Sequence, residues 1–394
     1  MDSNHRRRKS TDLQSVAFDR SATPPLCSFF RGLKTNHFDF SSAYIQYFLL
    51  NVNLFFRLCI FLWCSNNFSF SIIGLSFNFI DDIRVHKCMW ILQSDQNDLS
   101  GVKMIVETEK INIKSLDIDL MKGEEIAYLI NNEDKKIAWA VGDIIPDIGD
   151  AIEKIAERLR LGGRMAYFGA GTSGRIGVLD ASEMPPTFGV SPDLIQGYIA
   201  GGDKALRCAV ENAEDKSELA QEDFNSFNAG KNDVVVAISA CGNPNYTLKV
   251  LQLGQEVGAL TIAITSNPNA VFKEFADIFL CVKLGAEVVT GSSRMKSGTA
   301  HKMILNMLST GAMIRLGKVY HNYMVDLQIN NKKLHNRAVN MITEISGTDE
   351  KTAQKTLEIA GNVKTACVML MKNCDKATAE ELLAKNEGIL RKVI

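Results

Sequence analysis

Short apolar runs alternate with amphipathic stretches through the middle of this 394-residue chain. Five runs have the length and continuous hydrophobicity of buried strands, at 165–168, 194–199, 233–238, 260–265 and 278–282. Helically spaced stretches separate them, at 174–182, 205–213, 246–257 and 270–275. Continuous apolar strands between amphipathic helices are typical of a parallel sheet covered on both faces. We therefore predict an α/β fold with a doubly wound, five-stranded parallel sheet, whose ligands bind at the carboxyl ends of the strands.

Helices are predicted both before and after the sheet region in the sequence. Residues 123–141 and 143–161 carry apolar side chains at helical spacing. A further helix is expected at 297–316, and residues 326–394 have the pattern of several helices joined by short connections. The predicted organisation has N-terminal helices at 104–163, the sheet domain at 164–325 and a small C-terminal helical module at 326–394.

The first hundred residues have a different composition from the rest. They hold 13 of the 20 Phe and four of the 9 Cys. Residues 49–80 are apolar enough to suggest a membrane span, but Arg57 interrupts them, and a central Arg costs ~2.5–3.5 kcal/mol on insertion scales. We interpret residues 1–103 as an extra segment, non-native or disordered, translated upstream of a natural start at Met104.

Charge and cysteine content narrow the function classes. The chain carries 44 Lys+Arg and 45 Asp+Glu, which argues against a protein that binds the nucleic-acid backbone. The odd number of cysteines, at scattered spacings, argues against a disulfide framework, and no Cys/His pattern completes a zinc site. We expect a cytoplasmic protein with no metal, no nucleic-acid partner and no membrane association.

The most specific motif is the loop 169–175, Gly-Ala-Gly-Thr-Ser-Gly-Arg, which follows a predicted strand and opens a helix. It matches a dinucleotide fingerprint formally, but the acidic residue expected ~20 positions further on is missing, since Asp203 comes late. Backbone N–H groups, the helix dipole and two hydroxyls suit a phosphate monoester instead. A tight turn that needs glycine for steric reasons is the remaining alternative. The candidate ligands are Gly171, Thr172, Ser173 and Arg175.

Two more polar loops follow strands of the predicted sheet, at 239–244 and 290–299. Three Ser/Thr/Gly-rich loops at one sheet edge are more specific than any one of them. The third loop adds Arg294 and Lys296, cations that suit a phosphate. The candidate binding residues from these loops are Ser239, Gly242, Asn243, Ser292, Ser293, Arg294 and Lys296.

Carboxylates that could exchange protons lie at two places. Glu183 ends the first helix of the sheet domain, roughly 13–15 Å from the helix end that begins at Gly174, so a turn of the chain or a neighbouring subunit must bring it to the phosphate. Glu211 and Glu214 are expected on one face of the helix that follows the second strand. Most single glutamates are solvated surface groups, and the residues alone do not decide among these three.

Three long segments resemble the N-acetylmuramic acid 6-phosphate etherases of bacterial cell-wall recycling. They are GAGTSGRIGVLDASEMPPTFGV at 169–190, IAGGDKALRCAVENAED at 199–215 and GAEVVTGSSRMKSGTAHKMILNMLSTGAMIRLGKVY at 285–320. The resemblance runs from about Glu107 to the C-terminus and implies the sugar isomerase (SIS) fold. It also implies cleavage of the D-lactyl ether of N-acetylmuramic acid 6-phosphate by syn elimination and hydration, without metal or redox cofactor, in a homodimer.

The resemblance assigns roles by motif position. Glu183 looks like the family's proton donor and Glu214 like its second carboxylate, the base; the loop 171–175 looks like the phosphate clamp. One departure is in the third-strand loop, where the family has Ser-Gly-Arg-Thr-Pro. Here Cys241 replaces the hydroxyl with a thiol, a weaker donor, and Asn243 replaces the arginine, so substrate affinity or tolerance is expected to differ.

Two other functions fit a sugar-phosphate site on this fold. One is a non-catalytic sugar-phosphate-binding regulator, and the other is an aldose–ketose phosphate isomerase, which also removes a proton from carbon 2. The presence of both Glu183 and Glu214 favours catalysis, and no helix-turn-helix pattern precedes the sheet domain. An isomerase and an etherase differ in the leaving group, which the sequence does not reveal.

Overall fold

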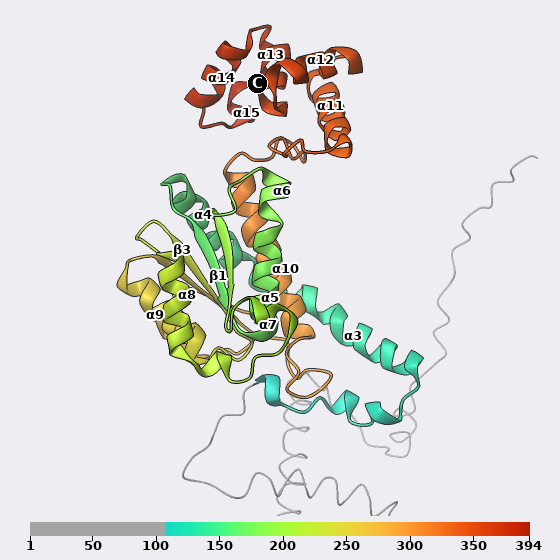
Figure 1. Ribbon diagram of the computed structural model, residues 1–394. Coiled ribbons are helices and arrows are strands. Elements are labelled where there is room, and N and C mark those ends of the chain that lie inside the picture. Colours follow the sequence, from blue (N-terminus) through green and yellow to red (C-terminus); the bar gives the residue numbers. More distant parts are fainter. Residues whose placement is uncertain (1–106) are drawn as a thin grey trace, which may run out of the picture. The chain divides into compact units, whose positions relative to one another are not determined.

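The structure, a computed structural model, describes residues 107–394 (Figure 1). The extra segment 1–103 and its apolar stretch 49–80 lie outside the described residues. Within the described part, no helix is both long and apolar enough to cross a membrane.

A single five-stranded parallel sheet forms the centre of the described sheet domain. Its strands are β1 (Met165–Gly169), β2 (Ile195–Ile199), β3 (Val234–Ile238), β4 (Leu260–Thr265) and β5 (Ile278–Cys281). The strand order is β2-β1-β3-β4-β5, and Met165 of β1 pairs with Ile195 on one side and Val234 on the other. The chain reverses its direction of winding between β1 and β3, so ligands are expected at the carboxyl ends of these two strands. The predicted doubly wound parallel sheet is confirmed.

Helices cover both faces of the sheet because its strands are apolar on both sides. Tyr167 of β1 belongs to the core shared with α4 (Ile145–Arg160) and α10 (Lys296–Arg315). Its neighbour Phe168 packs in the opposite core, where α8 (Ser217–Phe227) and α9 (Asn245–Glu256) lie. The first crossover helix, α5 (Gly171–Ser182), packs closely on β1 and β2 and also contacts α10 (Figure 1).

Shorter elements connect these layers. They are α6 (Met184–Phe188), α7 (Asp203–Arg207), η4 (Ala213–Asp215) and η5 (Val271–Phe275). The helix predicted at 205–213 is wrong, because Cys208 has an extended backbone that ends α7 and Asn212 is left-handed with φ 57°. The predicted shared helix face of Glu211 and Glu214 is therefore wrong as well.

The predicted helices at 123–141 and 143–161 are confirmed, and a stretch with short turns precedes them. Three turns of 3-10 helix, η1 (Glu107–Glu109), η2 (Ile113–Ser115) and η3 (Ile118–Leu120), precede α3 (Gly123–Gly142). One side of α3 packs on α10 and buries Glu133, Ile137 and Val141. The other side leaves Tyr128 and Trp139 exposed, at 61% and 82%.

The C-terminal residues form the predicted helical module with a core of its own. Its helices are α11 (Lys332–Ser346), α12 (Glu350–Ala360), α13 (Val363–Lys372), α14 (Lys376–Lys385) and α15 (Leu390–Val393). A polar side chain caps the N-terminus of each of the first four, from Asn331, Asp349, Asn362 and Asp375. These caps satisfy N–H groups that a helix cannot bond internally, which explains why such short helices begin where they do.

Candidate functional site

A pocket of about 320 Å³ lies at the carboxyl ends of β1 and β3. Segments far apart in the sequence meet there, because parallel strands deliver their following loops to one edge. The predicted site residues that line it are Gly171, Thr172, Ser173, Glu214, Ser239 and Ser293. The pocket therefore brings together all three predicted loops and one of the two carboxylates singled out by the family resemblance.

The turn between β1 and α5 forms one wall of this pocket. Gly171 has φ +53°, and a Cβ on Gly174 would lie 2.6 Å from both the carbonyl oxygen of Gly169 and the side chain of Ile199. Glycine is thus required for the close approach of helix and strand. Ala170, at the N-cap, supplies no side-chain acceptor, so the first N–H groups of α5 are left for a ligand. Together with the helix dipole, they suit an anion.

The loop after β3 contributes through Ser239 and Cys241. The Ser239 hydroxyl accepts a hydrogen bond from the Gly242 N–H at 3.0 Å and lies 3.6 Å from the Cys241 sulfur. Gly242 has φ +71°, and its Cβ position is occupied by Ala270 and Phe272. The Asn243 side chain accepts from the backbone N–H of Val271 at 3.3 Å. Gly242 and Asn243 therefore shape this loop and do not line the pocket, unlike the prediction.

Two cations of the predicted site have other partners. The Arg175 guanidinium donates to the carbonyl oxygens of Leu206 at 3.1 Å and Ala205 at 2.7 Å, and so ties α5 to α7. The Lys296 ammonium is buried, 3.0 Å from a carboxylate oxygen of Glu133. Neither side chain lines the pocket, so the prediction that they face a phosphate is not met by this arrangement. The sequence marks both as cations but cannot reveal which partners the fold gives them.

The remaining loop residues divide between two hollows. Ser293 lines the main pocket, whereas Ser292 does not. Arg294 lines an adjacent groove along α5 and α10, together with Lys302. Thr172 and Gly298 line both hollows, so the groove and the pocket adjoin at these two residues.

The two candidate carboxylates lie apart in one protomer. Glu214, in η4, lines the pocket. Glu183 is the C-cap residue of α5, is exposed, and is absent from the pocket lining. The rise of a helix places it roughly 14 Å along α5 from Gly174, toward the edge of the sheet opposite the pocket. A single chain thus presents one of the two groups to a ligand in this pocket.

Motif reasoning missed four polar pocket residues, Thr108, Glu109, Thr247 and His301. Thr108 and Glu109 come from the N-terminal segment, where the carbonyl oxygen of Thr108 accepts from the N–H of Gly291 at 3.2 Å. The only sequence signal for them was the extent of the family resemblance, which begins near residue 107. His301, on α10, is 1% exposed, with its Nε2 3.2 Å from the Ser266 hydroxyl. Burial lowers the pKa of His301 to about 4, against a backbone hydrogen bond with Thr265 that raises it, so the imidazole is neutral at pH 7.

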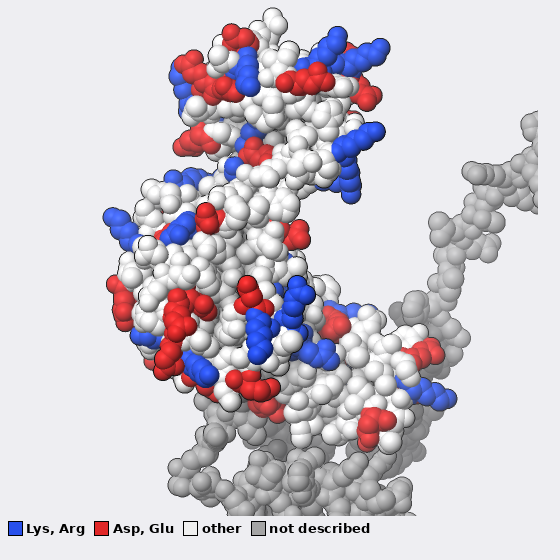
Figure 2. Space-filling view, in the orientation of Figure 1, with Lys and Arg blue, Asp and Glu red and all other residues white. Residues whose placement is uncertain are grey.

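The charged side chains that line the pocket are Glu109 and Glu214, both acidic. Among the residues that the structure describes, Lys/Arg and Asp/Glu side chains are interspersed over the face shown in Figure 2. The same described residues contain no group of three or more His, Cys, Asp or Glu that could hold a metal ion. Several hydroxyl-bearing side chains and the uncapped start of α5 meet in the pocket lining.

Models of known protein families match much of the described chain. The model described as "Glucokinase regulatory protein N-terminal SIS domain" matches residues 147–254, and the one described as "SIS domain" matches residues 212–311. A third, "C-terminal lid domain of glucokinase regulatory protein", matches residues 321–360. The sheet domain therefore has the SIS fold that the motifs implied.

Curated relatives are similar over nearly their whole length. An N-acetylmuramic acid 6-phosphate etherase from Glaesserella parasuis is 48% identical over 71% of this chain and 93% of its own. One from Actinobacillus pleuropneumoniae is 45% identical over 76% of this chain and 99% of its own. One from Clostridium botulinum is 49% identical, over 73% and 96% respectively. Identity at this level extends well beyond the pocket loops.

Proposed function

Since the chain belongs to the family of N-acetylmuramic acid 6-phosphate etherases, we propose that it releases D-lactate from N-acetylmuramic acid 6-phosphate and leaves N-acetylglucosamine 6-phosphate. The reaction serves the recycling of cell-wall amino sugars. The observation that carries the proposal is the pocket itself, in which a helix N-terminus suited to a phosphate lies beside the carboxylate of Glu214.

The phosphate of the sugar binds at the start of α5 in this proposal. The free N–H groups of the first turn and the hydroxyls of Thr172 and Ser173 donate to its oxygens. Ser239 and Ser293 line the same pocket, and we expect their hydroxyls to donate to the sugar. Because the anion is held by dipoles and hydroxyls, the site needs no dedicated arginine in the pocket.

The proposed chemistry is that of a carbon–oxygen lyase. Opening of the sugar ring exposes the aldehyde at carbon 1, which acidifies the proton on carbon 2. Glu214 removes that proton as general base, and the bond between carbon 3 and the lactyl oxygen breaks as the double bond forms. Lactate leaves with a proton from the second carboxylate, which the family resemblance assigns to Glu183. Water then adds across the new double bond: its oxygen bonds to carbon 3 as the second carboxylate takes up one of its protons, and Glu214 returns the abstracted proton to carbon 2, so both carboxylates are restored.

A homodimer is part of the proposal. Glu183 does not line the pocket of its own chain, and Leu179, one helical turn before it, is 50% exposed. In a dimer that covers this end of α5, Glu183 of each chain would lie beside the pocket of the other chain. The location proposed for such an enzyme of sugar metabolism is the cytoplasm.

The test is lactate release by purified protein supplied with N-acetylmuramic acid 6-phosphate. We expect D-lactate and N-acetylglucosamine 6-phosphate in equal amounts. In ¹⁸O-labelled water the label should enter the sugar product and not the lactate, because the carbon 3–oxygen bond breaks on the sugar side. Binding of the sugar phosphate without lactate would overturn the proposal and favour a regulator, and a ketose product without lactate would favour an isomerase.

A further inference from the structure

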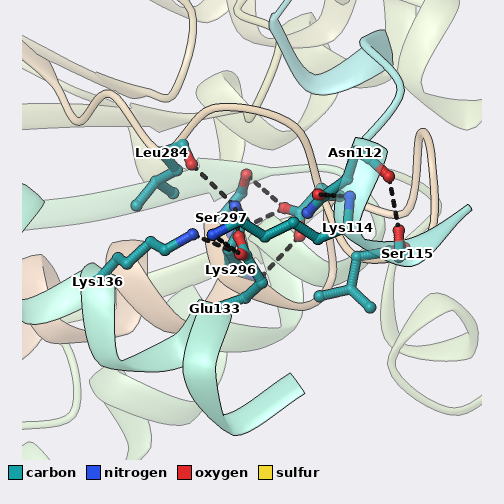
Figure 3. A network of polar contacts seen from close by, with 10 residues as sticks. Asn112, Lys114, Ser115, Glu133, Lys136, Leu284, Lys296 and Ser297 are labelled. Atoms are coloured by element: carbon teal, nitrogen blue, oxygen red, sulfur yellow. Dashed lines mark hydrogen bonds and ion pairs between the residues drawn. The ribbon is translucent and has the colours of Figure 1, made fainter. Parts of the chain in front are cut away.

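A buried ion pair fastens the start of α10 to the N-terminal segment (Figure 3). The Lys296 ammonium lies 3.0 Å from a carboxylate oxygen of Glu133 and donates to the carbonyl oxygen of Leu284 at 2.9 Å. The two charged side chains are only 2% and 5% exposed. Lys136 and Lys114 reach the same carboxylate from the solvent side. Burial alone would raise the pKa of Glu133, but hydrogen bonds from Lys136 and Lys296 lower it overall, so the carboxylate is charged.

A second buried carboxylate completes the network. Glu287 is 1% exposed and accepts from the backbone N–H groups of Lys296 and Ser297, each at 3.0 Å. It also accepts from the Ser297 hydroxyl at 2.9 Å. The N-cap residue of α10, Met295, has no side chain to do this, so Glu287 caps the helix from a distance. Lys296 is thereby held by two carboxylates, one at its backbone and one at its ammonium.

The chain segments held by this network are those that form one side of the pocket. Gly298 follows directly and donates its N–H to the carbonyl oxygen of Ser293 at 3.0 Å, and both residues line the pocket. On the other side, the Ser115 hydroxyl donates to the carbonyl oxygen of Val288 at 2.7 Å. The Gly291 N–H bonds to Thr108, another pocket residue. Movement of the ion pair would therefore move groups on the pocket wall.

Stability alone is a weak reason for such an arrangement. Replacing a buried ion pair with apolar side chains of similar volume often leaves a protein as stable or more so, since charges lose their hydration on burial. We propose that Glu133, Glu287 and Lys296 are positioning residues, which hold the loop 290–298 and the N-terminal segment at the geometry that the sugar phosphate requires without touching it. This inference rests on the proposed function.

The experiment separates position from stability with a double variant. Glu133→Leu combined with Lys296→Met fills the same space without charge and is expected to keep a melting temperature near that of the wild type. Its KM for N-acetylmuramic acid 6-phosphate should rise about tenfold or more, with a smaller change in kcat, because small misplacements of binding groups weaken binding strongly. Amide hydrogen exchange in residues 290–298 should accelerate in the same variant. The matched control is Lys135→Met on the same helix, whose exposed ammonium donates to Asn132 at 3.0 Å and not to Glu133, and which should change neither the KM nor the exchange of residues 290–298.

Each result of this experiment has a definite meaning. A double variant with wild-type KM and wild-type exchange would overturn the inference and leave the network a structural role only. If the double variant fails to fold, the KM and the amide exchange of Glu133→Gln are measured instead and are interpreted by the same criteria. If the wild type releases no lactate, the proposed function fails, while the exchange of residues 290–298 still tests whether the network orders the loop.

Discussion

Glu214 reaches the pocket from a turn and not from the predicted helix. The left-handed backbone of Asn212 lets Ala213 point inward, at 4% exposure, and sets Glu214 on the pocket wall. We expect Glu214→Gln to lower kcat about 10²- to 10⁴-fold while the product still binds, because the amide keeps the shape but cannot accept the proton. Lactate release and calorimetric binding of N-acetylglucosamine 6-phosphate measure the two effects.

The control for that variant lies three residues earlier. Glu211→Gln removes a carboxylate that is exposed and absent from the pocket lining, so its kcat should stay near that of the wild type. Equal losses in Glu211→Gln and Glu214→Gln would contradict the assignment of Glu214 as the base.

Gly174 tests the requirement for close packing at the phosphate loop. A Cβ there would meet the Gly169 carbonyl and the Ile199 side chain at 2.6 Å, so Gly174→Ala should cost about 1–3 kcal/mol of unfolding free energy and raise KM. Gly149→Ala, inside α4 with nothing within 4 Å of its Cβ position, should be neutral or stabilising by up to ~1 kcal/mol. Denaturant unfolding of both variants measures the difference, and similar values for the two would contradict the packing argument.

His301 should make the stability of the protein depend on pH. Its pKa is lowered from 6.5 to about 4 by burial, so the unfolded chain binds a proton that the folded chain refuses. The contribution is therefore complete above pH 6.5 and is lost as the pH falls toward 4. Between pH 7 and 4.5 the wild type should lose roughly 2–3 kcal/mol more unfolding free energy than His301→Gln does. Equal losses in the two proteins, measured by denaturant unfolding, would show that the ring is protonated in the folded state.

Among the elements, the strands and long helices could be predicted from the sequence with small errors. The run 278–282 corresponds to β5, and the stretch 297–316 to α10, because continuous apolar strands and wide apolar helix faces leave strong patterns. The prediction of one helix at 205–213 was wrong, because over so few residues a short helix followed by turns has the same apolar spacing as a continuous helix. Side-chain partners were the second failure: a motif marks Lys296 as a cation near the loop but not that Glu133, 163 residues earlier, takes up its charge.

The contact between α5 and α7 gives Arg175 a role that can be separated from phosphate binding. Its guanidinium donates to two carbonyl oxygens near the end of α7, so Arg175→Met should lower stability by about 1–3 kcal/mol, since these partly buried acceptors lose a charged donor. Its KM should change less than that of Ser173→Ala, whose hydroxyl lies on the pocket wall. Thermal unfolding and steady-state kinetics of the two variants test this. A larger rise of KM in Arg175→Met would restore the earlier expectation that this arginine contacts the phosphate.

For the whole molecule, the separation of Glu183 from the pocket is the main consequence of the fold. A helix that begins at the phosphate loop must end at the opposite edge of the sheet, so no local motion brings its C-cap residue back to the start. If Glu183 takes part in the reaction, symmetric pairing of two copies is the simplest way to supply it, because each copy then completes the pocket of the other. The solution mass should accordingly correspond to two chains.

Mixed dimers of two inactive variants test this arrangement directly. Glu183→Ala and Glu214→Ala are each expected to abolish lactate release. When the two are unfolded together, mixed in equal amounts and refolded, random pairing makes half of the dimers mixed, and one site in each mixed dimer has both carboxylates, so activity should return to about one quarter of the wild type. Two differently tagged chains allow the mixed dimer to be isolated and its single competent site measured. If both carboxylates came from one chain, every site in the mixture would lack one of them, and no activity would return although mixed dimers had formed.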